Sequence, residues 1–134
     1  MTKESPELFR VIDANLNRLK EGIRVIEDIV RYRDNNKTTA LKLKNLRHLA
    51  KLDNTLTLLQ YRDSTNDVLR PSIKTEQERF DITSILLANF KRTQESSRVL
   101  EEIFKLSNIS YSENFKTIRY ELYTLEKEVL LNEK

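Results

Sequence analysis

Apolar side chains recur every three or four residues along most of the chain, which is the spacing of one face of an α-helix. The first helix is predicted from Ser5-Pro6 to about Arg33, with the apolar series Phe9, Ile12, Leu16, Leu19, Ile23, Ile26 and Val30. A Leu-rich series predicts a second helix from about Thr38 to Gln60. Two further helices are predicted to begin at capping boxes, one at Thr75–Glu78, running to about Leu106, and one at Ser110–Glu113.

The first and third predicted helices contain two copies of one sequence. ANLNRLKEGIRVIEDI (14–29) recurs as ANFKRTQESSRVLEEI (88–103), 74 residues later and without a gap, with identity at eight of sixteen positions. The identical positions include the polar pairs Asn15/Asn89, Arg18/Arg92, Glu21/Glu95, Arg24/Arg98 and Glu27/Glu101. LKNLRH (43–48) likewise matches FKTIRY (115–120), so the repeated unit is a helical hairpin.

We therefore predict an all-α fold, a four-helix bundle built from two duplicated antiparallel helical hairpins with pseudo-twofold symmetry. The repeats are 9–60 and 81–132, the linker is 61–75, and 1–134 forms a single helical domain. An alternative is a dimer in which hairpins exchange partners between two chains.

Composition favours long helices and excludes several classes of active site. One Gly and two Pro leave few helix breakers and no glycine-rich phosphate loop. There is no Cys, and His48 is the only His, which argues against thiol and zinc chemistry. The net charge of +3 comes from interleaved acidic and basic residues, a pattern that does not favour nucleic-acid binding. Because no apolar run or signal peptide is evident, a cytoplasmic location without membrane insertion is expected.

The repeated polar residues fall on two parts of each helix. On a helical wheel, Asn15 and Arg18 lie on the buried side beside Gly22, and Asn89 and Arg92 lie beside Ser96. These pairs either tie the repeats together or form an anion cradle between them. Glu21, Arg24, Glu95 and Arg98 lie nearer the polar edge, where surface ion pairs are expected.

Two other features suggest a polar site. Leu19 and Ile23 are replaced by Thr93 and Ser97 in the second copy, which predicts a polar-walled pocket beside the third helix. In the linker, Asp63 and Asp67 are spaced to hold a hard cation such as magnesium, or alternatively to cap their own turn amides.

The order of these motifs resembles a known family. DANLNRLKEGIRVIED, LKNLRH, RDSTNDV and ANFKRTQESSRVLEE are similar to the helical domain of thiamine biosynthesis often fused ahead of thiamine phosphate synthase. The resemblance covers about residues 10 to 106. It implies a single-function hydroxymethylpyrimidine phosphate kinase, with ATP and Mg²⁺ as cofactors and hydroxymethylpyrimidine phosphate as substrate.

The resemblance also implies roles for individual residues. Arg18, Arg92 and Asp63 are the expected catalytic residues, and Asp63 and Asp67 the expected magnesium ligands. The expected substrate-binding residues are Asn15, Glu21, Arg24, Arg47, Arg62, Asn89, Lys91, Glu95 and Arg98. The alternative function is a non-catalytic helical partner of thiamine phosphate synthase, which the absence of a nucleotide loop and the long amphipathic helices favour. Thiamine phosphate synthase and a second copy of the chain are the expected macromolecular partners.

Overall fold

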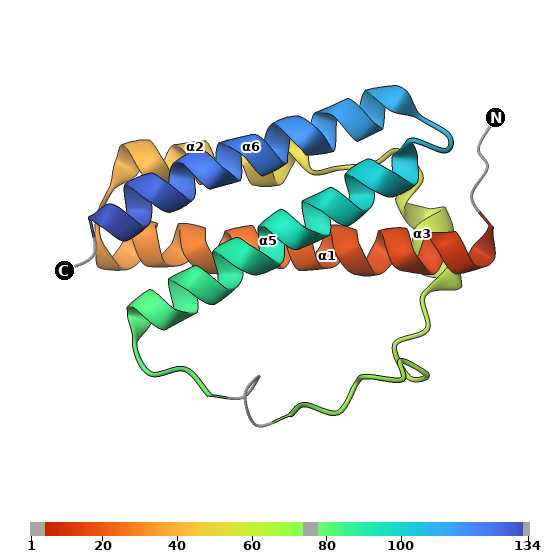
Figure 1. The fold of residues 1–134 in the computed structure, drawn as a ribbon, viewed down its shortest axis with the longest axis horizontal. Coiled ribbons are helices and arrows are strands. Elements are labelled where there is room, and N and C mark those ends of the chain that lie inside the picture. Colours follow the sequence, from red (N-terminus) through yellow and green to blue (C-terminus); the bar gives the residue numbers. More distant parts are fainter. Residues whose placement is uncertain (1–4, 74–77, 133–134) are drawn as a thin grey trace.

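The computed structural model describes residues 5–73 and 78–132, and these ranges are helical without a strand, as predicted (Figure 1). Its elements are α1 (Pro6–Asp28), a π-helical turn η1 (Ile29–Arg33), α2 (Lys37–Leu49), α3 (Thr55–Tyr61), α5 (Ile82–Phe104) and α6 (Ile109–Leu131). Within the described ranges, no helix is both long and apolar enough to cross a membrane.

The four long helices enclose one apolar core. Helix α1 packs against α2 and α5, and α6 packs against α5 and more weakly against α2. Figure 1 shows α2 and α6 running side by side, with α1 and α5 crossing beneath them. Leu19, Ile23, Leu43, Phe90 and Phe115 are among the fully buried side chains, so all four helices contribute to the core. The apolar periodicity of the first helix is confirmed.

Two of the predicted helix starts are wrong, and one is confirmed. Ser5 caps α1 and Pro6 occupies its first turn, as predicted. Helix α5 starts at Ile82, where Asp81 Oδ1 accepts a hydrogen bond of 2.8 Å from the Ser84 amide. Of the predicted capping box, residues 75–77 lie outside the described residues, and Glu78 is not helical.

The last helix starts two residues earlier than predicted. Asn108, rather than Ser110, caps α6 by accepting a hydrogen bond of 3.0 Å from the Tyr111 amide. Asn and Ser are comparable capping residues, so spacing alone did not decide between them.

The second predicted helix is interrupted after Leu49. Ala50 and Leu52 are buried at the break, which turns the chain so that α3 packs against α1. Helix α6 supplies partners for the interrupted backbone, because Asn114 donates to the Leu49 carbonyl at 3.2 Å and Tyr111 Oη accepts from the Asp53 amide at 3.3 Å. The prediction of one helix over 38–60 is therefore wrong, because these tertiary contacts stabilise the break.

The predicted pocket around Thr93 and Ser97 is also wrong. Both side chains are fully buried, and their hydroxyls donate to the carbonyls of Phe90 and Gln94 on their own helix. A Cβ built on Gly22 of α1 would lie 2.6 Å from Thr93 Cγ2. The volume lost in the second copy thus allows a close approach of α1 and α5 instead of a cleft.

Candidate functional site

The crossing of α1 and α5 brings the two copies of the repeated motif together. Asn15 Nδ2 donates to the Val11 carbonyl at 2.9 Å, and Asn89 Nδ2 donates in the same way to the Ile85 carbonyl at 2.8 Å. A Cβ on Gly22 would lie 3.9 Å from Asn89 Oδ1. The two Asn side chains therefore bond to equivalent carbonyls, and Asn89 lies directly against the first copy.

The predicted burial of the repeated arginines is wrong. Asn15 and Gly22 are buried, but Arg18 and Arg92 are exposed. Close contact between the helices is made through Gly22 and Thr93, so the long guanidinium side chains extend to solvent. In the described part of the chain, neither arginine forms an ion pair, and the exposed Glu21 and Glu95 form none either.

Arg24 and Arg98 form surface ion pairs as expected, but their partners are Asp28 and Glu102 rather than Glu21 and Glu95. Arg24 Nε lies 3.3 Å from Asp28 Oδ1, and Arg98 Nε lies 3.3 Å from Glu102 Oε1. Both pairs join residues four positions apart on a solvent-facing helix surface, so each contributes only a few tenths of a kcal/mol.

A pocket of about 460 Å³ adjoins the first copy, between the N-terminal half of α1 and the start of the linker. Five predicted site residues line it, namely Asn15, Arg18, Arg62, Asp63 and Asp67. Asp13 and Arg10 contribute to the same wall. The structure thus brings the first-copy and linker residues into one pocket.

The start of the linker is held on α1 by three contacts, which we call the linker latch. Arg62 forms a bidentate ion pair with the buried Asp13, with both N–O distances at 2.7 Å. This hydrogen bonding raises the pKa of Arg62, so the guanidinium stays charged. Arg10 Nη2 donates to the Asp63 carbonyl at 3.3 Å, and the Phe9 and Tyr61 rings stack at 5.3 Å.

The two linker carboxylates form local turn contacts. Asp63 accepts hydrogen bonds from the side chain and the backbone amide of Asn66, which lower the pKa of Asp63. Asp67 Oδ1 accepts from the Leu69 amide at 3.0 Å. Among the described residues, no group of three or more Asp, Glu or His side chains converges. The geometry matches the turn-capping alternative, and magnesium binding stays a prediction.

The remaining predicted site residues lie apart from this pocket. Lys91 Nζ is 3.1 Å from Glu126 on α6, and Arg47 is bonded to Glu27. Glu95 and Arg98 lie on the exposed face of α5. The structure therefore does not gather the full predicted set at one point.

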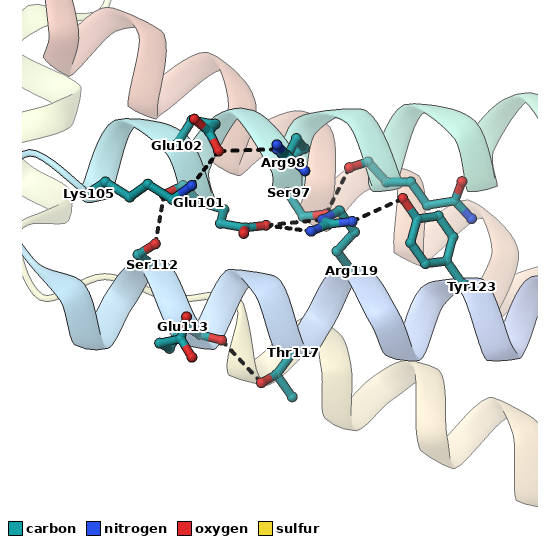
Figure 2. Close-up of polar contacts among 11 residues, drawn as sticks. Ser97, Arg98, Glu101, Glu102, Lys105, Ser112, Glu113, Thr117, Arg119 and Tyr123 are labelled. Atoms are coloured by element: carbon teal, nitrogen blue, oxygen red, sulfur yellow. Dashed lines mark hydrogen bonds and ion pairs between the residues drawn. The ribbon is translucent and has the colours of Figure 1, made fainter.

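Two largely buried ion pairs were not predicted from the sequence. Arg47 Nε lies 2.7 Å from Glu27 Oε1, joining α2 to α1, and Arg119 Nη2 lies 2.9 Å from Glu101 Oε1, joining α6 to α5 (Figure 2). Glu27 corresponds to Glu101, and Arg47 to Arg119, in the repeat alignment. This joint repetition was the available signal, because a pair that must meet is repeated as a pair.

The fold and site define an all-helical protein with polar residues repeated at a helix crossing and an ion pair repeated within each helix pair. Comparison with known proteins gives the family. The chain belongs to the ThiD2 family, whose model matches residues 10–128. No solved structure matches the chain.

Curated relatives of the chain are longer proteins named thiamine-phosphate synthase. The relative from Nostoc punctiforme is 39% identical over 127 residues, covering 92% of this chain and 35% of its own length. That from Thermosynechococcus vestitus is 37% identical, covering 96% of this chain and 37% of its own length. That from Rhodopirellula baltica is 33% identical, covering 96% and 36%. The chain spans about a third of the length of the curated relatives it matches.

These comparisons confirm a family related to thiamine biosynthesis and correct the predicted activity. The prediction of a kinase is wrong, because the relatives are named as a synthase and none of the findings gives this helical domain kinase activity. The kinase prediction came from the family resemblance alone, and the repeated arginines and the linker aspartates were then given roles that fit it. ATP as a cofactor stays an untested prediction.

Proposed function

We propose that the chain is a helical module that docks on a thiamine-phosphate synthase and thereby takes part in thiamine phosphate formation. The observation that carries this proposal is that relatives named thiamine-phosphate synthase contain a similar helical sequence as about a third of their length. Because more than nine-tenths of this chain matches part of one longer synthase chain, we infer that the helical module acts together with the rest of the synthase.

Exposed apolar side chains support docking. They lie on α3 and on the linker that follows it, and we call them the linker surface; its members are Leu56, Leu59, Val68 and Leu69. Val68 is 90% exposed and Leu69 is 83% exposed. Large apolar side chains exposed on successive segments are candidates for an interaction site, because burial by a partner removes them from water.

The experiment is to mix the purified chain with separately purified thiamine-phosphate synthase from the same organism and measure the mass of the complex by light scattering. We expect a complex at micromolar concentration, and a change in the synthase rate when the chain is present. A mixture that elutes as two separate species with an unchanged synthase rate contradicts the proposal.

A double variant tests the surface. Val68→Glu with Leu69→Glu places two charges on the linker surface and is expected to weaken docking about tenfold or more, because burying unpaired charges is costly. Leu131→Glu is the matched control, because Leu131 is also exposed but lies at the end of α6. Equal weakening by the control contradicts the assignment to the linker surface.

Ligand binding by the predicted site residues remains a proposal, and this binding does not require phosphoryl transfer. We propose that Asn15, Arg18 and Arg62 bind an anionic ligand in the 460 Å³ pocket beside α1. Arg18 supports this because it lines the pocket without an ion-pair partner among the described residues. Arg18→Gln is expected to abolish ligand binding without changing the thermal midpoint of unfolding.

We further infer that the scaffold is a duplicated pair of antiparallel hairpins, α1–α2 and α5–α6. The repeated contacts support this inference: Glu27–Arg47 corresponds to Glu101–Arg119, and the Asn15 hydrogen bond corresponds to that of Asn89. Asn36 and Asn108, 72 residues apart, cap α2 and α6 in the same way.

A further inference from the structure

A second pocket lies where α1 turns into α2, away from the linker. It has a volume of about 340 Å³, and we call it the corner pocket; it is lined by Glu27, Arg31, Asn35, Lys37, Ala40, Leu41 and Lys44. None of these residues was predicted as a site residue. The π-helical turn η1 and the positive φ of Asn35 (53°) give the corner its shape. Such π-helical turns are frequent at functional sites.

The corner pocket is positively charged. Arg31, Lys37 and Lys44 are exposed and form no ion pair within the described residues, although the Arg31 guanidinium lies 4.9 Å from the centre of the Tyr32 ring. The single carboxylate of the lining, Glu27, is already neutralised by the bidentate pair with Arg47. The pocket therefore presents three cations without a competing anion.

The start of α2 adds to this positive potential. Its first turn contains no acidic residue, so no carboxylate there offsets the partial positive charge of the helix N-terminus. Asn36 Oδ1 bonds to the Thr39 amide at 3.1 Å, which fixes the first turn beside the pocket. Lys37, Leu41 and Lys44 follow at helical spacing and form one wall.

The corresponding corner of the second copy has the same framework but different chemistry. Figure 2 shows the Glu101–Arg119 pair there, matching Glu27–Arg47. Lys105, the counterpart of Arg31, forms an ion pair of 2.6 Å with Glu102. Ser112, the counterpart of Ala40, donates across the corner to the Glu101 carbonyl at 2.8 Å.

Two further replacements remove the positive charge of the second corner. Ile109 stands in place of Lys37, and Glu113 stands in place of Leu41, in the repeat alignment. Only Lys116 keeps the charge of its counterpart, Lys44. The shared ion pair and Asn cap are therefore scaffold features, whereas the group of three unpaired cations and the open apolar wall belong to the first corner alone.

We propose that the corner pocket binds a small organic phosphate. Arg31, Lys37 and Lys44 hold the phosphate oxygens, and Ala40 and Leu41 contact the apolar part of the ligand. The volume suits a small molecule, and charge-assisted hydrogen bonds from several cations are the usual means of holding a phosphate. This site goes beyond the proposed docking function and shares no residue with the linker surface.

The test is an amide NMR titration of the whole chain, with inorganic pyrophosphate, inorganic phosphate and phenyl phosphate as separate probes. We expect shifts over about residues 27–47 that are separate from any shifts around Arg18, and tighter binding of phenyl phosphate than of inorganic phosphate because of the apolar wall. Absence of shifts from residues 27–47, or equal shifts at both corners, overturns the proposal.

Matched variants separate the pocket from general charge effects. Lys37→Gln with Lys44→Gln is expected to weaken pyrophosphate binding at least about tenfold, because two charge-assisted contacts are lost. Lys116→Gln with Lys105→Gln removes two charges from the other corner and is expected to leave binding unchanged. Leu41→Glu, which introduces the residue found in the second copy, is expected to abolish binding. Equal effects of the two double variants overturn the proposal, and unchanged circular dichroism shows that all three variants are folded.

Discussion

Removal of Arg119 tests whether the repeated ion pairs hold the helix pairs together. Arg119 donates through Nε and Nη2 to Glu101 Oε1, at 3.0 and 2.9 Å, and through Nη1 to Tyr123 Oη at 3.2 Å. The side chains of Arg119 and Glu101 are only 9% and 7% exposed. Arg119→Met keeps most of the side-chain volume but leaves Glu101 buried without a cation.

The expected loss follows from this burial. Breaking a buried ion pair by removing one partner costs about 3–5 kcal/mol, because the remaining charge is uncompensated. The total free energy of unfolding of a domain is about 5–15 kcal/mol, so the loss is a large fraction. The double variant Glu101→Leu with Arg119→Met removes both charges and is expected to recover most of the loss.

Urea unfolding followed by circular dichroism at 222 nm measures these differences. Arg98→Met is the control, because its pair with Glu102 is exposed and is worth less than about 1 kcal/mol. Arg47→Met is expected to cost about as much as Arg119→Met, since the Arg47 side chain is 17% exposed but its partner Glu27, only 1% exposed, would lose its cation. A loss below about 1 kcal/mol for Arg119→Met, or a double variant less stable than the single one, refutes the reasoning.

Three other changes give distinct readouts. Gly22→Ala is expected to lower the free energy of unfolding by about 1–2 kcal/mol despite the better helix propensity of Ala, because the new Cβ meets Thr93 Cγ2. Adding Thr93→Ser to the Gly22→Ala variant should restore the stability measured by urea unfolding. If Gly22→Ala alone stabilises the protein, the close contact is contradicted. Arg62→Ala is expected to speed hydrogen exchange in residues 62–73 and to lower the thermal midpoint less than Arg119→Met does, because Arg62 is 42% exposed although its partner Asp13 is only 9% exposed. Unchanged exchange rates would show that the latch does not hold the linker. Asp81→Ala is expected to destabilise the start of α5, whereas Asp81→Asn is not. Hydrogen bonds from the Ser84 amide and hydroxyl lower the pKa of Asp81, so its stabilisation is present above the ordinary pKa and is lost as the pH falls through the lowered one. In thermal unfolding between about pH 2 and pH 7, the difference between the unsubstituted chain and the Asp81→Ala variant should disappear at the acidic end.

The helices could be predicted where local signals and packing agree. Ser5 and the regular apolar series set the start and the buried face of α1, and the core confirms both. The break after Leu49 could not be predicted, because its partners Tyr111 and Asn114 are more than 55 residues away in sequence. Asp81 and Asn108 were overlooked as caps because a Ser or Thr with a Glu three residues on seemed the stronger signal.

The candidate site shows why the repeat carries more information than the helical wheel. The wheel placed Asn15 and Arg18 on the same buried stripe, yet Arg18 is exposed, because burial depends on which position the neighbouring helix approaches. Identity between the copies, in contrast, marked Glu27 and Glu101 together with Arg47 and Arg119, and these pairs are buried in both helix pairs. Identity at Arg18 and Arg92 has no such structural explanation, since both are exposed and unpaired in the described part of the chain. When a polar residue is repeated in both copies but makes no structural contact, its repetition indicates a role in binding. Arg18 is therefore the first residue to test in the pocket beside α1.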